Sequence, residues 1–581
     1  MVGKLLFDFV AEDGNIERKV FENPIKIVTT TTLQEVRKAL DEVQQAVDRG
    51  YYAAGYVSYE AAPAFDPAYL VAQHPQMPLL WFGIYEKPIV VDEACVQASF
   101  SMGKWQGDTD KKRYNKTIQH IKTAIAAGET YQVNYTMRLY AGFFGDDLAY
   151  YDHLRLAQRA KYSAYMDLGR FRIVSLSPEL FFQSKENQII TRPMKGTIAR
   201  AKQYEDDQKM AMILATSEKD QAENVMIVDL IRNDLAKIPG VKSVHVPQIF
   251  SIERFPTVYQ MTSTIEANYA MKPTLLQVFD ALFPCGSITG APKVSTMKII
   301  AQVEQNSRDV YCGAIGYVEP DGEATFNVAI RTVWLDSMTG KACYGVGGGI
   351  TWDSTEEGEY EEAMMKTRFL HKESVEFSLL ETLKWEDGQY FLLDRHLHRM
   401  NQSAMYFDFT FDRSKVMQSL EDHAQLYVGQ TRRVRLLLAS TGSCQVESTS
   451  LLQTSMTQQD IALAKTPIDQ EDIFLYHKTT HREVYAYHKE ENPEVYDILL
   501  WNEQGQITEF TTGNVVVEIQ GQKWTPSLAC GLLNGTYREQ LVEEGILEEK
   551  ILTIEEVLRA TKVWLINSVR GFVPVRIREA G

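Results

Sequence analysis

Cysteine and long apolar runs are both scarce in this sequence. Its six cysteines lack CxxC spacing, which predicts reduced, mostly buried thiols. No stretch approaches the roughly 18 apolar residues that a membrane helix needs. The apolar stretch at the start of the chain is too short for a signal peptide, and the acidic residues Glu12 and Asp13 follow it. We therefore expect a cytoplasmic protein with no membrane span.

Positive charge is also in short supply. The chain has 60 Lys and Arg against 77 Asp and Glu, a formal net charge of −17. This balance argues against general nucleic-acid binding, which needs a basic surface. A small anionic substrate would need local cations, either a metal ion or basic side chains in the pocket. With 581 residues the chain is too long for one core and predicts at least two domains.

The domain boundary has to be inferred from motifs, because there is no repeat, low-complexity tract or Pro/Ser-rich linker. A polar helical segment from Ser354 to about Lys372 is followed by the strand-like residues 378–384 and an Asp-Gly turn. This order is typical of the first hairpin of a new domain. We expect one domain over residues 1–371 and a second over 375–581, with a short join.

The first domain mixes alternating strands with helices. Phe171–Ser177 and Ala324–Val333 alternate as strands do, and Lys219–Lys237 is strongly helical. The strands come in hairpin-like groups rather than in strict βαβ alternation. The pattern predicts an α+β fold with largely antiparallel sheets.

Glu179 and Lys195 flank a predicted hairpin formed by residues 180–183 and 188–191. The carboxyl and the amine then lie a few Å to about 10 Å apart. They suit a general acid and a nucleophile. A surface ion pair remains the alternative, and this segment alone favours it.

Two acidic pairs have the i, i+3 spacing that places both carboxylates on one helix face: Asp220 with Glu223, and Glu359 with Glu362. Residues 225–231 are apolar nearly all round, so the first helix should be buried and Glu223 partly desolvated. Buried like charges are costly without a hard cation, and Mg²⁺ suits carboxylates combined with substrate oxygens. The alternative for the second pair is a solvated helix face.

Glycine-rich loops at residues 284–293 and 344–350 let backbone N–H groups approach an anion. Neither matches a nucleotide-binding fingerprint. After the boundary, Lys478, Glu509 and a Gly535-Thr536 step that opens a helix form the minimum set for pyridoxal phosphate: Schiff-base lysine, pyridine partner and phosphate anchor. Singly, each has an ordinary structural explanation.

In their order along the chain, the motifs of the first domain strongly resemble the chorismate-utilising enzymes, which include the anthranilate, aminodeoxychorismate, isochorismate and salicylate synthases. The resemblance covers roughly residues 50–370 and implies a two-layer α/β sandwich with large antiparallel sheets. Its carriers are residues 128–134, 177–179, 192–197, 223–234, 290–293, 330–332 and 347–366.

This resemblance implies that Glu223 and Glu362 bind Mg²⁺ directly, with Asp220 and Glu359 assisting. It also implies that Glu179 protonates the departing C4 hydroxyl of chorismate. The implied substrate contacts are Gln132, Thr197, Ser287, Tyr311, Arg331, Gly347, Gly349 and Lys366.

Three positions separate the branches of the family. Isochorismate-type members have a lysine base where this chain has Gln132, and anthranilate synthases usually have a histidine at Gln260. Aminodeoxychorismate synthases have a lysine at the position of Lys195, thought to attack C2 before ammonia enters at C4. The resemblance thus implies amination of chorismate to aminodeoxychorismate. Ser58-Tyr-Glu60 falls where anthranilate synthases bind tryptophan, and here we expect a structural role.

The second domain resembles fold-type IV pyridoxal-phosphate enzymes, specifically the aminodeoxychorismate lyases. The supporting segments are residues 377–383, 395–399 and 567–571. The resemblance implies that Lys478 attaches the cofactor and removes the C4 proton, and that loss of pyruvate yields 4-aminobenzoate for folate biosynthesis. It implies further cofactor contacts by Glu509, Arg399, Thr512, Gly535 and Thr536, with Arg433 and Arg435 as weaker candidates for the substrate carboxylate.

The Gly-x-Cys-x-Gly element of glutamine amidotransferases is absent. We therefore expect a separate amidotransferase subunit that supplies ammonia, and a homodimer through the lyase domain is the family expectation. Two alternatives stay open: an anthranilate synthase fused to an aminotransferase-like domain, and a synthase with a non-catalytic C-terminal domain.

Overall fold

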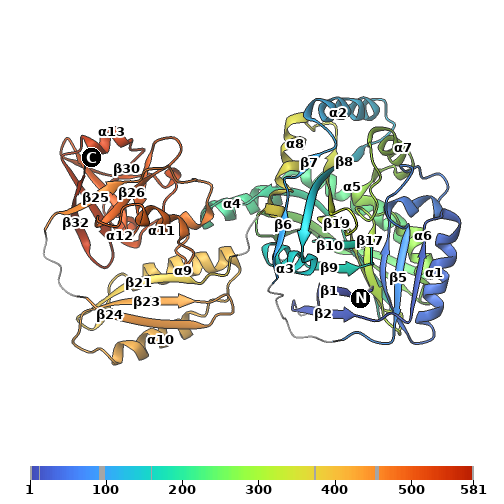
Figure 1. Cartoon of the computed structure of the whole chain (residues 1–581), viewed down its shortest axis with the longest axis horizontal. Coiled ribbons are helices and arrows are strands. Elements are labelled where there is room, and N and C mark those ends of the chain that lie inside the picture. The colour runs from blue at the N-terminus through green and yellow to red at the C-terminus, as the bar shows by residue number, and fades with distance from the viewer. Residues whose placement is uncertain are drawn as a thin grey trace. The chain divides into compact units, whose positions relative to one another are not determined.

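The computed structural model describes residues 3–11, 14–89, 98–158, 160–371, 375–451 and 457–578. The chain forms two units (Figure 1): Met1–Arg200 with Met210–Ser374, and Ala201–Lys209 with Val375–Gly581. The predicted first domain is thus interrupted at residues 201–209, which pack with the second unit. Residues 372–374 of the predicted join, and Cys95, lie outside the described ranges.

Two large antiparallel sheets build the first unit. The first sheet has the order β16 (Gly290–Ala291), β8 (Gln132–Gly145), β20 (Lys341–Ile350), β19 (Thr332–Asp336), β10 (Phe171–Ser177), β9 (Tyr162–Asp167), β1 (Leu5–Val10), β2 (Ile16–Phe21), with β6 (Phe100–Met102) and β7 (Gln106–Gly107) on β8. The second has the order β13 (Met194–Ala199), β15 (Val258–Tyr269), β12 (Gln188–Arg192), β11 (Leu180–Lys185), β18 (Ala324–Val328), β17 (Ala314–Val318), β4 (Tyr52–Val57), β5 (Leu80–Tyr85), β3 (Lys26–Thr30), with β14 (Val241–Arg254) on β15.

The two sheets of the first unit share one core. Phe7 and Ile173 of the first sheet pack in the same buried cluster as Tyr56, Trp81 and Ile315 of the second. Strand side chains alternate between faces, so the opposite faces are free to bury helices. The second sheet is covered by α1 (Leu33–Val47), α5 (Glu218–Ala236) and α6 (Leu275–Leu282). The first is covered by α2 (Lys111–Ala126), α3 (Asp147–Gln158), α7 (Lys293–Val303) and α8 (Glu356–Met365).

The predicted helix over residues 219–237 is confirmed as α5, but its burial is not. Ser217 caps α5 by accepting a hydrogen bond from the Asp220 N–H, and one helix face packs on the core. Val225 is 39% exposed, so the expectation that residues 225–231 are buried all round is wrong. Only one face of α5 has a sheet to pack against.

The predicted strand at Phe171–Ser177 is β10, and the predicted hairpin is β11 with β12. Ala324–Val333 is not a single strand. It divides into β18 and β19, which belong to different sheets. The chain changes sheet at Arg331, whose φ of 50° lies in the left-handed region. Alternation alone does not reveal such a crossing.

The second unit contains a four-stranded antiparallel sheet and an eight-stranded mixed sheet. The smaller has the order β22 (Gln389–Tyr390), β21 (Leu379–Glu386), β23 (Arg432–Leu438), β24 (Cys444–Ser450), with α9 (Leu393–Phe407) and α10 (Arg413–Gln425) packed on it. The larger has the order β27 (Ile507–Phe510), β26 (Asp497–Trp501), β25 (Gln459–Leu463), β32 (Gly571–Ile577), β31 (Lys562–Asn567), β28 (Asn514–Ile519), β29 (Gln522–Pro526), β30 (Glu548–Lys550). The remaining helices of this unit are α11 (Glu483–Glu490), α12 (Thr536–Glu543) and α13 (Ile554–Leu558). The α+β class with large antiparallel sheets is confirmed.

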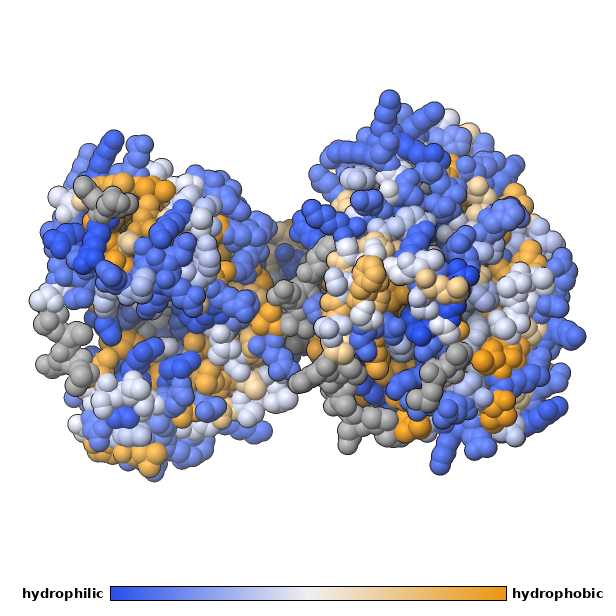
Figure 2. Space-filling model, in the orientation of Figure 1, coloured by the Kyte–Doolittle hydropathy of each residue, from blue (hydrophilic) through white to orange (hydrophobic). Residues whose placement is uncertain are grey.

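The described cysteines are free thiols, and four of the five are buried. No helix in the described part of the chain combines the length and the apolar content needed to cross a membrane. The visible face of each unit is predominantly hydrophilic (Figure 2), as the net charge of −17 suggests.

Candidate active sites

Glu179 lies in the connection between β10 and β11 and is only 3% exposed. One carboxylate oxygen, Oε1, accepts a hydrogen bond of 2.6 Å from the Ser287 hydroxyl. Burial raises the pKa of Glu179 to about 7, although Ser287 and Lys195 act in the opposite direction. A carboxyl group with this pKa can donate a proton at neutral pH. The alternative of a surface ion pair is wrong for Glu179.

Lys195 lies near the start of β13, against the glycines of β20. A Cβ atom on Gly349 would lie 2.7 Å from Lys195 Nζ and 2.1 Å from Gln132 Nε2, so both side chains use space that only glycine leaves free. Burial lowers the pKa of Lys195, which increases the fraction of nucleophilic amine.

Gln132 is 1% exposed, and neither its amide oxygen nor its amide nitrogen has a hydrogen-bond partner among the described residues. Buried amides are nearly always bonded. The amide donor and acceptor of Gln132, beside Lys195, are therefore free to bond a polar ligand.

Acidic side chains of α8 lie beside the glycines of β20, and one of α5 lies beside Gly196, the neighbour of Lys195. A Cβ on Gly348 would lie 3.1 Å from Glu359 Oε2 and 3.7 Å from Glu362 Oε1. A Cβ on Gly196, next to Lys195, would lie 3.2 Å from Asp220 Oδ1. Within the described ranges, no three His, Cys, Asp or Glu side chains are close enough together to form a ready-made metal site.

The pKa values of these acids reflect their surroundings. Burial raises the pKa of Glu223 and of Glu359. The Lys366 amine, 2.8 Å from Glu362, lowers the pKa of that carboxyl. Lys366 also donates a 2.9 Å hydrogen bond to the Gly347 carbonyl. Oxygen donors of α8 thus lie beside β20 and one of α5 lies beside β13, with the Lys366 amine next to Glu362.

Arg331, predicted at the substrate, is a half-buried cation. Its guanidinium donates to Gln158 Oε1 at 2.8 Å, and it forms no ion pair in the described part of the chain. Burial lowers its pKa. Tyr311, also predicted at the substrate, is 6% exposed and lies with its ring under the Arg138 guanidinium at 5.3 Å. Thr197 is exposed on β13, opposite Gln260.

The second unit has its own lysine and carboxylate pair. Burial, with Arg482 and Arg399 nearby, lowers the pKa of Lys478 to about 7. Glu509 is 4% exposed and accepts a 2.8 Å hydrogen bond from the Tyr485 hydroxyl. Burial raises the pKa of Glu509 to about 7.

A buried polar cluster adjoins the N-terminus of α12. The Thr536 hydroxyl lies 3.2 Å from His396 Nε2, and His396 Nδ1 lies 2.6 Å from Glu381 Oε2. Arg399 donates to both Glu381 oxygens, at 2.8 and 2.6 Å, and to the Asn534 carbonyl at 2.9 Å. Backbone N–H groups at a helix start attract phosphate, and here a guanidinium and a hydroxyl adjoin them.

Two segments of the chain match two different protein families. Residues 97–372 match the family described as chorismate binding enzyme, and residues 378–577 match amino-transferase class IV. The chain joins a chorismate binding enzyme domain to a class IV amino-transferase domain.

The curated relatives match the chorismate-binding domain. Aminodeoxychorismate synthase component 1 of Escherichia coli (strain K12) is 40% identical over 269 residues, which is 46% of this chain and 59% of the relative. The protein of the same name from Bacillus subtilis (strain 168) is 35% identical over 269 residues, 46% of this chain and 57% of the relative. The chain thus spans less than two thirds of these relatives.

Among solved structures, anthranilate synthase component I from Streptococcus pneumoniae TIGR4 has a TM-score of 0.54 at 24% identity. The match covers 61% of this chain and 91% of that chain. At this identity the likeness shows the fold of the chorismate-binding domain and no more.

The donor set of the chorismate-binding domain suits Mg²⁺ by its chemistry. Mg²⁺ takes one or two protein carboxylates and completes its shell with water and substrate oxygens, so a ready-made group of three is not required. The class IV domain suits pyridoxal phosphate. A Cβ on Gly535 would lie 2.0 Å from Asn514 Oδ1, so only glycine fits at the start of α12.

Two predicted ligands of the class IV domain have other partners. The Thr512 hydroxyl donates to Asp497. Arg435 forms a 2.8 Å ion pair with Glu447, its neighbour on β24, and both side chains are more than 40% exposed. Burial lowers the pKa of Arg433, and the neighbouring cations Arg435, Arg570 and Arg482 lower it further.

Sequence reasoning missed three residues of the class IV site: Glu381, His396 and Tyr485. Glu381 and His396 stand inside segments that carried the family resemblance, beside Arg399, so their motif was a usable signal. Tyr485 had none, because its contact with Glu509 depends on how α11 packs.

Proposed function

We propose that the chorismate-binding domain converts chorismate and ammonia to 4-amino-4-deoxychorismate, and that the class IV domain eliminates pyruvate from this product to give 4-aminobenzoate. The observation that carries the proposal is the half-buried Lys195, whose amine lies beside Gln132 and Gly349 and whose pKa is lowered. The relatives named aminodeoxychorismate synthase component 1 support the choice of reaction.

In the first reaction, the Lys195 lone pair forms a bond to C2 of chorismate. Both conjugated ring double bonds shift and the C4–oxygen bond breaks, while Glu179 gives its proton to the departing oxygen, which leaves as water. Ammonia then bonds to C4, both double bonds shift back, the bond to Lys195 breaks, and the new ammonium group returns a proton to Glu179. Chorismate and ammonia thereby become aminodeoxychorismate and water. Burial favours both the neutral amine and the protonated acid that this sequence needs.

Glu223 and Glu362 would hold Mg²⁺, with Asp220 and Glu359 assisting. The ion would neutralise a substrate carboxylate and orient the ring. Arg331, half-buried and without an ion pair in the described ranges, would bind another carboxylate. Ser287 holds Glu179 in place through the 2.6 Å hydrogen bond.

In the class IV domain, Lys478 would attach pyridoxal phosphate, which supplies an electron sink when bound. A lysine with a pKa of about 7 can take the C4 proton as a base. Glu509, held by Tyr485, would pair with the pyridine nitrogen. Arg399, Gly535 and Thr536 surround the helix start proposed to take the phosphate.

Ammonia is proposed to come from a separate glutamine amidotransferase subunit, since the nucleophile motif of that class is absent from the sequence. The name "component 1" of the relatives supports a second component. Purified chain should then use ammonium salts and fail with glutamine; turnover of glutamine by the pure chain would contradict this. We also propose a homodimer through the class IV domain, as in similar enzymes.

Matched variants test the two reactions separately, with chorismate, ammonium and Mg²⁺ supplied to the purified protein. Lys195→Ala should abolish amination, whereas Lys112→Ala, an exposed lysine in the same domain, should not. Lys478→Ala should accumulate the amino intermediate and release no pyruvate. Near-normal amination by Lys195→Ala would reject the covalent role. Undiminished pyruvate release by Lys478→Ala would reject the lyase.

A further inference from the structure

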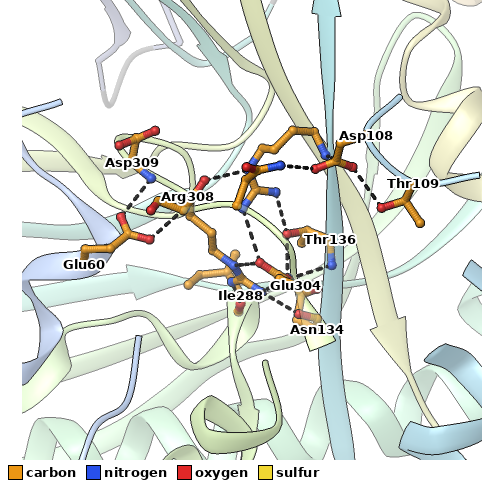
Figure 3. Close-up of polar contacts among 12 residues, drawn as sticks. Glu60, Asp108, Thr109, Asn134, Thr136, Ile288, Glu304, Arg308 and Asp309 are labelled. Carbon is orange, nitrogen blue, oxygen red and sulfur yellow. Dashed lines mark hydrogen bonds and ion pairs between the residues drawn. The ribbon is translucent and has the colours of Figure 1, made fainter. Parts of the chain in front are cut away.

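Arg308 is a buried cation, 1% exposed, in the connection between α7 and β17 (Figure 3). Its guanidinium pairs with Glu304 through Nη2 at 2.7 Å and Nε at 3.1 Å. The same group donates to two backbone carbonyls, Ile288 at 2.8 Å and Asn134 at 2.7 Å. A planar group with five donors is required to bond these three partners at once.

Both carbonyls belong to elements of the chorismate site. Ile288 follows Ser287, whose hydroxyl donates to Glu179. Asn134 lies on β8, and its N–H donates to the Thr289 carbonyl at 2.8 Å. Arg308 thus fastens the short turn that carries Ser287 to β8. Arg308 is therefore connected to Glu179 through the peptide that joins Ser287 to Ile288 and through the Ser287 hydroxyl.

The backbone of Arg308 is itself held in place. Glu60 accepts hydrogen bonds from the N–H groups of Arg308, at 2.7 Å, and Asp309, at 2.8 Å. The Tyr59 ring lies against the guanidinium, with 4.5 Å from its centroid to Cζ. The protein's own backbone therefore occupies both carboxylate oxygens of Glu60, which gives this residue a structural role.

Glu304 is shared with a second arginine. Arg138 donates to Glu304 Oε2 at 3.2 Å, and the N–H and hydroxyl of Thr136 donate to Oε1 at 2.9 and 2.8 Å. These partners lower the pKa of Glu304, so it stays charged although it is buried. The anion and its donors form a fixed base for the Arg308 guanidinium.

We propose that Arg308 is a positioning residue for Glu179, because it fixes the Ser287 turn and so the hydrogen bond that orients the acid. The inference rests on the proposed role of Glu179 as the acid. If Arg308 releases the Ile288 carbonyl, the turn relaxes and Ser287 moves off Glu179. The Ser287 hydrogen bond lowers the pKa of Glu179, so its loss should raise that pKa.

The test titrates Glu179 directly. The infrared C=O stretch of its protonated carboxyl is measured against pH as a difference from Glu179→Gln, in the full chain without substrate. Lysine in Arg308→Lys keeps the charge near Glu304 but cannot bond both carbonyls as well. We expect Ser287→Ala and Arg308→Lys each to raise the pKa by about one unit. In the double variant, Arg308→Lys should not raise the pKa of Glu179 beyond the value in Ser287→Ala, because both changes remove the same Ser287–Glu179 hydrogen bond.

Arg155→Lys is the matched control, a buried arginine paired with Asp8 and Asp152 away from the turn, and it should leave the titration unchanged. If Arg308→Lys does not fold, Glu304→Gln should shift the titration in the same direction. An unshifted titration in the folded variant, or an additive shift in the double variant, would overturn the proposal. The readout needs no turnover, so failure to aminate chorismate would refute the proposed function alone.

Discussion

Half-buried Lys478, with its lowered pKa, should make the class IV domain less stable, by an amount that depends on pH. Its pKa falls from 10.5 to about 7. At ~1.4 kcal/mol per unit, folding with the amine charged costs up to about 5 kcal/mol. The unfolded chain binds the extra proton between these two values, so stability rises with pH across that window and the full cost applies below it. Lys478→Met should therefore stabilise the cofactor-free protein by about 3 kcal/mol more at about pH 6 than at about pH 9.5.

Hydrogen exchange of peptides from β26 and β28 gives the opening free energy of this unit within the whole chain. The packing difference between lysine and methionine is the same at both pH values, so it cancels and leaves the charge effect. Lys489→Met, at an exposed lysine of the same unit, should show no comparable pH dependence. If Lys478→Met gains equally at both pH values, burial does not lower the pKa of this lysine and the reasoning fails.

Three further changes follow from the site geometry. Glu179→Gln should slow amination with ammonium at least about 100-fold, measured as chorismate consumption, because no proton can be donated. Gly349→Ala should impair amination, since its Cβ would lie 2.7 Å from the lysine amine, whereas Gly142→Ala, whose nearest contact would be 3.8 Å, should not. Tyr485→Phe removes a hydrogen bond that lowers the pKa of Glu509, so that pKa should rise above about 7. Cofactor affinity, followed by visible absorbance, should then weaken near neutral pH and recover at higher pH; an unchanged affinity profile would refute this.

The sequence predicted local features that depend on near neighbours. The i, i+3 spacing placed both acidic pairs on helices, and the pattern around residues 180–191 predicted a hairpin. The sequence did not predict that the chain changes sheet at Arg331. The left-handed backbone conformation of this residue depends on how the two sheets pack. The exposure of Val225 was missed for a similar reason: an apolar run does not tell how many helix faces find a partner.

In the two candidate sites too, local features could be predicted and long-range contacts could not. Lysines and carboxylates could be proposed from residue type, motif order and family resemblance. Their pKa shifts could not, because burial sets them. The link from Arg308 to Glu179 runs through a backbone carbonyl, which has no signature in the side-chain sequence. Contacts of that kind become visible only when segments distant in the chain are brought together.

The most direct test of the account is the identity of the product that the purified chain makes from chorismate, ammonium and Mg²⁺ with added pyridoxal phosphate. The products are separated by chromatography and identified by mass. The account predicts 4-aminobenzoate and pyruvate in equal amounts. Anthranilate would contradict it, and so would an amino intermediate that persists without release of pyruvate.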